Sequence, residues 1–459
     1  MNRTECHCSA TTGPSGSPRA LPRAVLVLGA ILAVVYLLQV ASPLRLKTDA
    51  IVYLSLAESA ASGNGFLYRG EPAAFPLGYP LLLAGLIRAG LGSPWAFVAL
   101  NLVFLAIGLA AAFWIARRAF RQNACTALLL CEITLLSYLV ARAAPLPASD
   151  VPYFGLSLAC LALLVHVEAG GSARWLFPAL LLGVGALWTR SVGIALAPAF
   201  LWSLRSRVPL RAPGAGGRPG WRRGTALLAF AGAALLLVGG GLLLVGAFYW
   251  EAATDRALSF GSPLEAIARI GLERLGEAGQ VALNVPLSQT PSVLHAAFAP
   301  AGAFAILLLL AGGWARRPRI TAADAYLAAY LLILVLFPFG DPRYWFPVLP
   351  LAAVWALEAA RSRPSSAAAA WLARAWFAVY LLTGILALGY TTRISLSGDR
   401  FPERFGSDGK LRPTYRVAFG QADPSRTPGV DEEALALLRR FEPRARPSRR
   451  TAPSPGDME

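Results

Sequence analysis

The sequence predicts an all-α, polytopic membrane protein with about eleven transmembrane helices and interfacial helices in its first outer loop. Two observations predict this fold class. Hydrophobic residues make up 56% of the 459-residue chain and charged residues only 15%, whereas a soluble protein of this length carries more charge. The apolar residues are also grouped in runs close to the roughly 20 residues that a helix needs to cross a bilayer. Because backbone groups in lipid must bond to one another, each run is expected to be helical.

The net charge of +17 is distributed in a way that favours a membrane protein over a nucleic-acid-binding one. Most Lys and Arg residues lie in short loops between apolar runs, as the positive-inside rule describes. We therefore predict no nucleic-acid partner. Three of the cysteines, Cys125, Cys131 and Cys160, lie inside apolar runs, where a small buried side chain is the expected role.

The chain opens with a polar segment, and residues 1–23 are predicted to form a disordered cytoplasmic N-terminus. The first span is predicted over Ala24–Ala41, and no small-residue cleavage site follows it. The loop after this span carries Asp49 in the first turn of a helix, with Thr48 as its N-cap. The glycines of "SGNGF" are predicted to end that helix.

The next apolar run, Phe75–Leu91, is short and contains Pro76 and Pro80. If it crossed the membrane, the span Trp95–Ala116 would deliver the three arginines of "ARRAFRQ" to the outside. That placement breaks the positive-inside rule, so we predict that Phe75–Leu91 lies along the interface.

The remaining runs then alternate between the two sides of the membrane. The predicted spans are Ala124–Val140, Val151–Val167, Trp175–Trp188, Val192–Leu204, Thr225–Phe248, Phe298–Trp314, Ala322–Phe339, Tyr344–Leu357 and Trp371–Tyr390. A basic loop, Arg205–Arg223, is predicted inside, and a polar stretch, Glu251 to about Ser292, outside. The transmembrane domain is thus expected to occupy residues 24–390.

Residues 391–459 form a polar tail rich in Arg and Pro. We predict that it is extracytoplasmic and largely irregular. Asp431–Phe441 is the exception, because its acidic residues come first and its basic residues last, as a helix dipole prefers.

This topology gathers charged side chains from distant segments on one face of the membrane. They are Asp49, Asp150, Arg190, Asp341 and Arg343, each at the outer end of a different predicted span. Charges near membrane depth are costly and tend to mark function when they converge. The alternative interpretation is that these are simply the polar residues of solvent-exposed loops.

Motifs around these charges follow one another in a set order. They are Asp49; Gly63, Gly65, Gly78, Tyr79 and Pro80; Ser149, Asp150 and Pro152; Arg190 and Gly193; and Arg343, Tyr344, Pro347 and Pro350. This order resembles the membrane-embedded C-type glycosyltransferases, in the branch of the protein O-mannosyltransferases and the lipid A aminoarabinose transferases. The resemblance covers roughly Ala24 to Leu357. The branch often carries Asp-Glu at the first-loop acid, whereas Ala50 follows Asp49 here.

The resemblance implies transfer of a sugar from a polyprenyl-phosphate-linked donor to a lipid, glycan or protein acceptor. The reaction is expected to invert the anomeric carbon, on the outer face of the cytoplasmic membrane. Asp49 is the predicted base that takes the proton of the acceptor hydroxyl. Arg343 is the first choice for binding the lipid phosphate, because a guanidinium can bind phosphate through two bonds. Arg190 and Lys47 are the second choices.

Two further site residues keep alternative interpretations. Asp150 orients the acceptor, binds a divalent metal or caps the following helix. Tyr344 bonds the phosphate or belongs to an interfacial aromatic belt. A divalent metal held by Asp49 and Asp150 therefore stays open, and no other cofactor is predicted.

Three other functions compete with this interpretation. A secondary transporter also has broken helices and converging charges, but here the charges gather at one face rather than at mid-membrane. A lipid-linked glycan polymerase or ligase of another fold would need a large outer loop, and Glu251–Ser292 is modest. A non-catalytic scaffold would tolerate Asp49→Asn.

Overall fold

The structure, a computed structural model, describes residues 23–72, 75–205, 254, 262–337, 339–362, 366–405 and 410–445. Nearly all of the predicted N-terminal segment 1–23 and of the basic loop Arg205–Arg223 lies outside these described residues, as does the predicted span Thr225–Phe248.

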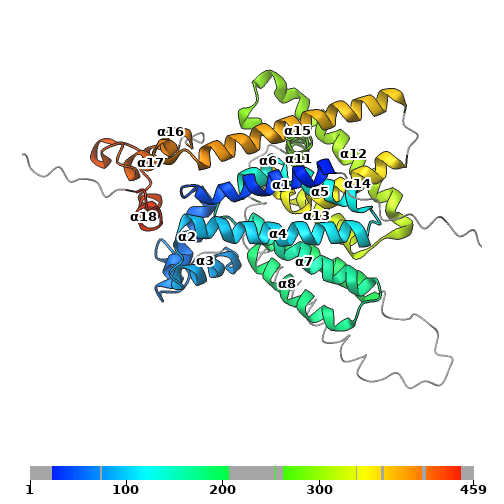
Figure 1. Ribbon diagram of the computed structural model, residues 1–459, viewed down its shortest axis with the longest axis horizontal. Helices are drawn as coiled ribbons and strands as arrows, with labels where there is room; N and C mark the ends of the chain where they lie inside the picture. Colours follow the sequence, from blue (N-terminus) through cyan, green and yellow to red (C-terminus); the bar gives the residue numbers. More distant parts are fainter. Residues whose placement is uncertain are drawn as a thin grey trace, which may run out of the picture.

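Long helices run side by side along the longest dimension of the molecule, with α1, α4, α7 and α15 clearest in Figure 1. Five segments are long and apolar enough to cross a membrane. They contain α1 (Arg23–Leu38, extended by a 3₁₀ turn, Gln39–Ala41), α4 (Pro94–Arg118), α7 (Asp150–Glu168), α12 (Phe298–Arg316) and α15 (Ala367–Ser395). All five coincide with predicted spans.

Shorter helices fill the spaces between the long ones. They are α5 (Ala124–Leu135), α6 (Tyr138–Ala143), α8 (Leu176–Thr189), α9 (Leu196–Arg205), α13 (Ala322–Leu336) and α14 (Leu349–Arg361). Short 3₁₀ helices, Ala173–Trp175, Leu287–Gln289, Ser292–Ala297 and Arg317–Arg319, link some of the helices. The predicted all-α polytopic class is confirmed, while the number of crossings stays a prediction.

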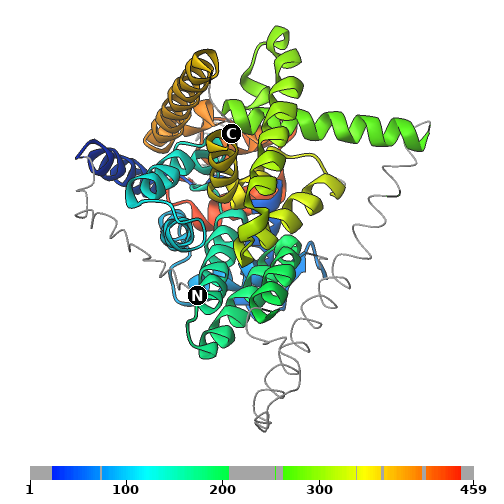
Figure 2. The same cartoon turned by 90° about the vertical axis from the view of Figure 1, so that its right-hand side faces the viewer.

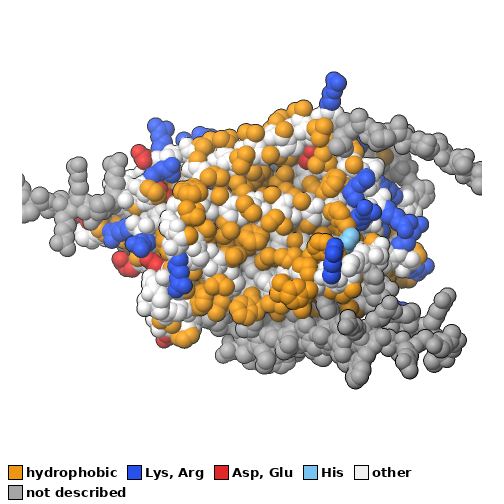
Figure 3. Space-filling view, turned by 60° about the horizontal axis from the view of Figure 1, so that its bottom comes forward, with side chains coloured by type: hydrophobic (Ala, Val, Ile, Leu, Met, Phe, Trp, Pro, Cys, Tyr) orange, Lys and Arg blue, Asp and Glu red, His pale blue; other side chains and the backbone are white. Residues whose placement is uncertain are grey.

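A broad apolar band covers the middle of the molecule, and Lys and Arg side chains gather toward its two ends (Figure 3). Large apolar side chains on three helices are strongly exposed, including Leu307 at 63%, Leu336 at 72% and Leu382 at 58%. A soluble protein rarely exposes so large a contiguous apolar surface. Lipid contact explains the band, because it removes these side chains from water.

The predicted span Ala124–Val140 is interrupted in the structure. Helix α5 ends at Leu135, and α6 begins at Tyr138 with Ser137 as its N-cap. Asn284 occupies the break: its amide donates to the carbonyl oxygen of Leu136 at 2.9 Å and accepts from the Tyr138 backbone N–H at 2.7 Å. A distant side chain therefore satisfies the backbone groups that the break leaves without helical partners.

The predicted outer stretch Glu251–Ser292 contains α11 (Pro263–Leu283), which runs across the long helices (Figure 2). Glycines permit its close packing against α12. A Cβ atom on Gly279 would lie 1.9 Å from the Phe298 carbonyl oxygen, and one on Gly302 would lie 1.7 Å from that of Leu275. At each of these contacts the glycine lacks the Cβ that would clash with the opposite backbone, so the two helices can approach closely.

The first outer loop contains α2 (Thr48–Ala61), a small hairpin of β1 (Leu67–Tyr68) and β2 (Glu71–Pro72), and α3 (Gly78–Arg88). Gly63 ends α2 with a φ of 87°, as the glycine pattern predicted. Thr48 is the first helical residue, however, and Lys47 is the N-cap, with no side-chain cap bond. Helix α3 is only about 16 Å long, too short for the roughly 30 Å apolar core of a bilayer.

The C-terminal tail differs from the largely irregular chain that the sequence predicted. Its described residues form α16 (Phe401–Arg404), α17 (Arg412–Ala418) and α18 (Glu432–Phe441), with 3₁₀ turns at Gly398–Arg400 and Pro424–Arg426. The predicted helix near Asp431 is confirmed as α18, and Asp431 caps it. The tail packs on α2 and α3 in a second apolar core, in which Tyr415 and Leu438 are almost fully buried. Its apolar side chains, spaced between many arginines, supply this core.

Candidate functional site at one end of the bundle

Arg343 joins the first outer loop to the segment that precedes α14. It lies in a 3₁₀ helix, Pro342–Val348, whose prolines disfavour a regular α-helix. Its guanidinium pairs with the Asp49 carboxylate at 2.5 Å and with the Asp341 carboxylate at 3.0 Å. Burial alone would lower the pKa of Arg343, but the two carboxylates outweigh it and raise the pKa, so the group stays charged.

A second ion pair joins Arg190 to Asp150. Asp150 is the first residue of α7, and Arg190 precedes a 3₁₀ helix, Ser191–Ala195, between α8 and α9. Their side chains are only 6% and 13% exposed. Removing one partner would leave the other charge uncompensated and buried, so each partner supports the other.

Tyr344 links the two ion pairs. The guanidinium of Arg190 lies 5.1 Å from the centre of its ring, and that of Arg343 lies 5.4 Å from it. Both contacts are in the range of cation–π attraction. The Tyr344 carbonyl oxygen accepts a hydrogen bond from Tyr330 at 2.8 Å. The structure therefore brings five of the six predicted site residues into one continuous cluster.

A cavity of about 230 Å³ lies beside this cluster and is lined mainly by aromatic and apolar side chains. Its charged residues are Asp49, Arg190 and Arg343. Its other lining residues are Tyr53, Phe75, Pro76, Thr189, Ser191, Val192, Tyr330, Ile333, Leu334, Phe337, Phe339 and Tyr344. We call it the aromatic cavity.

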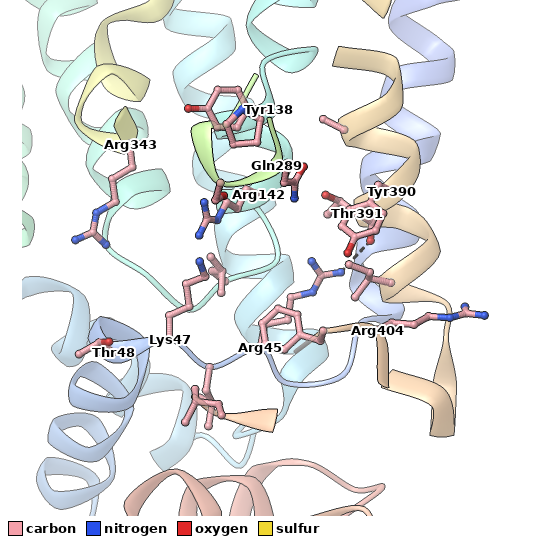
Figure 4. A pocket seen from close by; sticks show the side chains of 18 of the residues that line it. Arg45, Lys47, Thr48, Tyr138, Arg142, Gln289, Arg343, Tyr390, Thr391 and Arg404 are labelled. Carbon is pink, nitrogen blue, oxygen red and sulfur yellow. Dashed lines mark hydrogen bonds between the residues drawn. The ribbon is translucent and has the colours of Figure 1, made fainter. Parts of the chain in front are cut away.

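A larger cavity of about 500 Å³ also borders the Asp49–Arg343 pair. Seven of its lining residues are cationic and two are acidic; they are Arg45, Lys47, Arg142, Arg343, Arg404, Lys410, Arg412, Asp49 and Asp341. Figure 4 shows that Lys47, Arg142 and Arg343 come from three separate elements and extend toward the same space. We call it the cationic cavity. It places Lys47, the sixth predicted residue, beside the ion-pair cluster.

Asp49 and Arg343 line both cavities. The ion pair therefore forms part of the wall that separates an aromatic space from a cationic one. A ligand in either cavity could reach the same carboxylate and the same guanidinium.

Sequence reasoning missed Tyr53, which lies one helical turn after Asp49 and also lines the aromatic cavity. Its hydroxyl lies 3.1 Å from the Ser149 hydroxyl, and burial raises its pKa, so the phenol stays neutral. The spacing of four residues from Asp49 was the available signal, because it places both side chains on one helix face.

Each of the two predicted metal-ligating carboxylates faces a guanidinium group. Asp49 pairs with Arg343 and Asp150 pairs with Arg190, so a positive side chain already faces each predicted metal ligand. Within the described part of the chain, no three His, Cys, Asp or Glu side chains gather as metal ligands would. The divalent metal that the sequence left open at Asp49 and Asp150 stays a prediction.

Comparison with solved structures identifies the architecture. The apo structure of ArnT from Cupriavidus metallidurans is 18% identical, with a TM-score of 0.50, over 92% of this chain and 85% of that one. The chain has the ArnT fold. The structure of ArnT bound to undecaprenyl phosphate matches equally well, with 17% identity, a TM-score of 0.50 and coverage of 92% and 86%.

The archaeal oligosaccharyltransferase AglB from Archaeoglobus fulgidus is also similar, with 13% identity, a TM-score of 0.46 and coverage of 92% of this chain and 64% of that one. No protein-family model matches the sequence, and neither does any curated protein. ArnT is a membrane glycosyltransferase of the C type. The resemblance predicted from the ordered motifs is thus confirmed at the level of fold.

Proposed function

We propose that this chain is an integral membrane glycosyltransferase that moves a sugar from a polyprenyl-phosphate-linked donor to an acceptor outside the cytoplasmic membrane. One observation carries the proposal: the Asp49–Arg343 pair lies in the wall between two cavities of opposite character. A transferase of this kind needs a general base and a phosphate-binding cation at one point that two substrates can reach.

The donor enters the aromatic cavity in this proposal. Leu336 and Trp188, 72% and 52% exposed, adjoin residues that line this cavity and offer apolar surface to a lipid tail. A polyprenyl chain of about 55 carbons cannot leave the bilayer, at roughly 0.8 kcal/mol per buried methylene. The enzyme must therefore present Arg190 and Arg343 to the phosphate at the membrane surface.

The acceptor reaches Asp49 from the cationic cavity. The acceptor hydroxyl oxygen attacks the anomeric carbon, and its proton passes to the Asp49 carboxylate. The bond between that carbon and the phosphate oxygen breaks, and the phosphate leaves with the electron pair. Attack and departure on opposite sides invert the anomeric carbon.

Arg343 has two roles in this scheme. Without donor, it neutralises Asp49 and Asp341. A donor phosphate competes with these carboxylates for the guanidinium, and charge-assisted bonds to phosphate are strong. Donor binding thus releases Asp49 from its partner as the sugar arrives, so the base becomes available when it is needed.

Asp150 and Lys47 support this chemistry from either side. Asp150 holds Arg190 at the aromatic cavity through their ion pair. Lys47 lines the cationic cavity and adds positive charge on the side from which the acceptor arrives (Figure 4). Tyr344, between the two guanidinium groups, fixes their separation.

Mass spectrometry of envelope lipids, glycans and proteins from a deletion strain tests the proposal. The strain should lack one glycosylated product, which wild-type protein restores and Asp49→Asn does not. A Thr48→Ser variant is the matched control, because Thr48 is exposed and neighbours the same carboxylate. Full restoration by Asp49→Asn would remove the proposed base. Substrate accumulation in vesicles without any glycosylated product would instead favour a transporter.

A further inference from the structure

The segment that leads from α1 to Asp49 is extended and buried, yet belongs to no helix or strand. Leu44 and Leu46 are 2% and 1% exposed, and residues 42–47 have no regular secondary structure. Buried backbone groups must still find partners. The groups that bind the backbone of this segment therefore fix the position of Asp49.

The C-terminal tail provides the partners. The Tyr415 hydroxyl donates to the Leu44 carbonyl oxygen at 2.8 Å and accepts from the Leu46 backbone N–H at 2.7 Å. The Glu442 carboxylate accepts from the Leu44 backbone N–H at 2.7 Å. Two tail side chains, 1% and 3% exposed, thus bind three backbone groups of Leu44 and Leu46 just before α2.

The tail also contacts α2 beyond Asp49. Glu433 of α18 accepts a hydrogen bond from the Ser55 hydroxyl at 2.5 Å, and Arg440 pairs with Glu58 at 3.5 Å. The chain is therefore held three residues before Asp49 and again six residues after it. Leu46 lines the cationic cavity, whereas the Ser55 and Glu58 contacts lie outside both cavities.

The same segment carries two cations that line the cationic cavity, Arg45 and Lys47. Arg45 points away from the catalytic pair and donates to the Thr391 carbonyl oxygen and the Ser395 hydroxyl, and burial lowers its pKa to about 10. Lys47, two residues on, lines the cationic cavity. In an extended chain, residues two apart have side chains on the same face, and Arg45 and Lys47 both line this cavity.

We propose that the C-terminal tail positions the catalytic carboxylate: Tyr415 is a positioning residue that fixes the backbone of Leu44–Leu46 and thereby aims Lys47 and Asp49 at the wall between the cavities. This inference rests on the proposed role of Asp49. It assigns a positioning role in transfer to tail side chains, Tyr415 and Glu442, that line neither cavity.

The test compares Tyr415→Phe with Phe419→Leu in purified full-length protein. Tyr415→Phe removes only the hydroxyl and keeps the ring that packs on Phe401. Phe419→Leu weakens the same aromatic cluster, in which its ring also meets Phe401 and Tyr415, but leaves the hydrogen bonds to Leu44 and Leu46 in place. Hydrogen exchange of the peptide over residues 42–50 reports the backbone without any substrate.

Exchange at the Leu46 amide should accelerate about five- to a hundredfold in Tyr415→Phe, because a buried donor loses its partner. Phe419→Leu should change it less than about twofold. Transfer by membranes supplied with labelled polyprenyl-phosphate sugar should fall at least about tenfold in Tyr415→Phe only, since small misplacements of a catalytic group are costly. Binding of undecaprenyl phosphate should stay within about twofold in both variants.

Unchanged Leu46 exchange in Tyr415→Phe would overturn the positioning role, as would equal losses of transfer in the two variants. If Tyr415→Phe does not fold, Glu442→Leu, which removes the acceptor, provides the same comparison at the Leu44 amide. Wild-type protein without any donor-dependent transfer would refute the proposed function instead, and the exchange result would still decide the positioning role.

Discussion

Replacing Asp49 by Asn should slow transfer and strengthen binding of the lipid phosphate at the same time. The side chains of Asp49 and Arg343 are 30% and 34% exposed, so their pairing is screened and contributes about 1 kcal/mol or less. Asn keeps the shape of the side chain but no longer competes for the guanidinium. Undecaprenyl phosphate should therefore bind up to about fivefold more tightly, the equivalent of about 1 kcal/mol.

The same substitution removes the proposed base, which typically contributes about 10²- to 10⁴-fold to the rate. Binding is measured by titration of purified protein with undecaprenyl phosphate, and transfer by release of labelled sugar from the donor. Tighter phosphate binding together with slower transfer would indicate a carboxylate that both competes with the phosphate and acts as base. A variant that binds at least tenfold more weakly, or transfers at the wild-type rate, would refute the reasoning.

Two further predictions concern the donor site and its support. Arg343→Ala should weaken undecaprenyl phosphate binding about tenfold or more, because a charge-assisted contact is lost. Arg190→Lys keeps a cation and should lose less binding affinity. Equal, unimpaired donor turnover in both variants would argue against the phosphate role. Gly78→Ala should destabilise the protein by about 1–3 kcal/mol and lower its melting temperature, because the added Cβ would lie 2.7–2.8 Å from the Trp188–Thr189 backbone. Gly85→Ala on the same helix is the control, because a Cβ there would have no atom within 4 Å. Equal melting temperatures of the two variants would contradict this packing.

The sequence was sufficient to predict the elements that follow from composition and charge. Apolar runs located the five long spans, and the cations between them placed Asp49 and Arg343 on one face. Their contact in the structure supports the charge-based topology, since they are 294 positions apart and share one ion pair. Short-range signals, such as Gly63 at the end of α2, were also sufficient.

The features that the sequence did not reveal depend on distant partners. The break between α5 and α6 is satisfied by Asn284, far along the chain. The close crossing of α11 and α12 depends on Gly279 and Gly302 meeting the opposite backbone. No local sequence pattern predicts either contact.

The tail illustrates the same limit. Its arginines and prolines are typical of an irregular segment, but Tyr415 and Leu438 are buried against α2 and α3. Each tail helix is too short to be stable alone. Their stability comes from a surface that only the folded first loop provides.

The central claim is that a lipid-linked phosphate binds at the wall that Asp49 and Arg343 share. A structure of the protein in a lipid nanodisc with undecaprenyl phosphate measures this directly. We predict the phosphate within about 3 Å of the Arg343 guanidinium, near Arg190, with the prenyl chain leaving through the aromatic cavity and Asp49 no longer paired. Phosphate bound at the opposite end of the bundle, beside Arg118 and Arg361, would contradict the account.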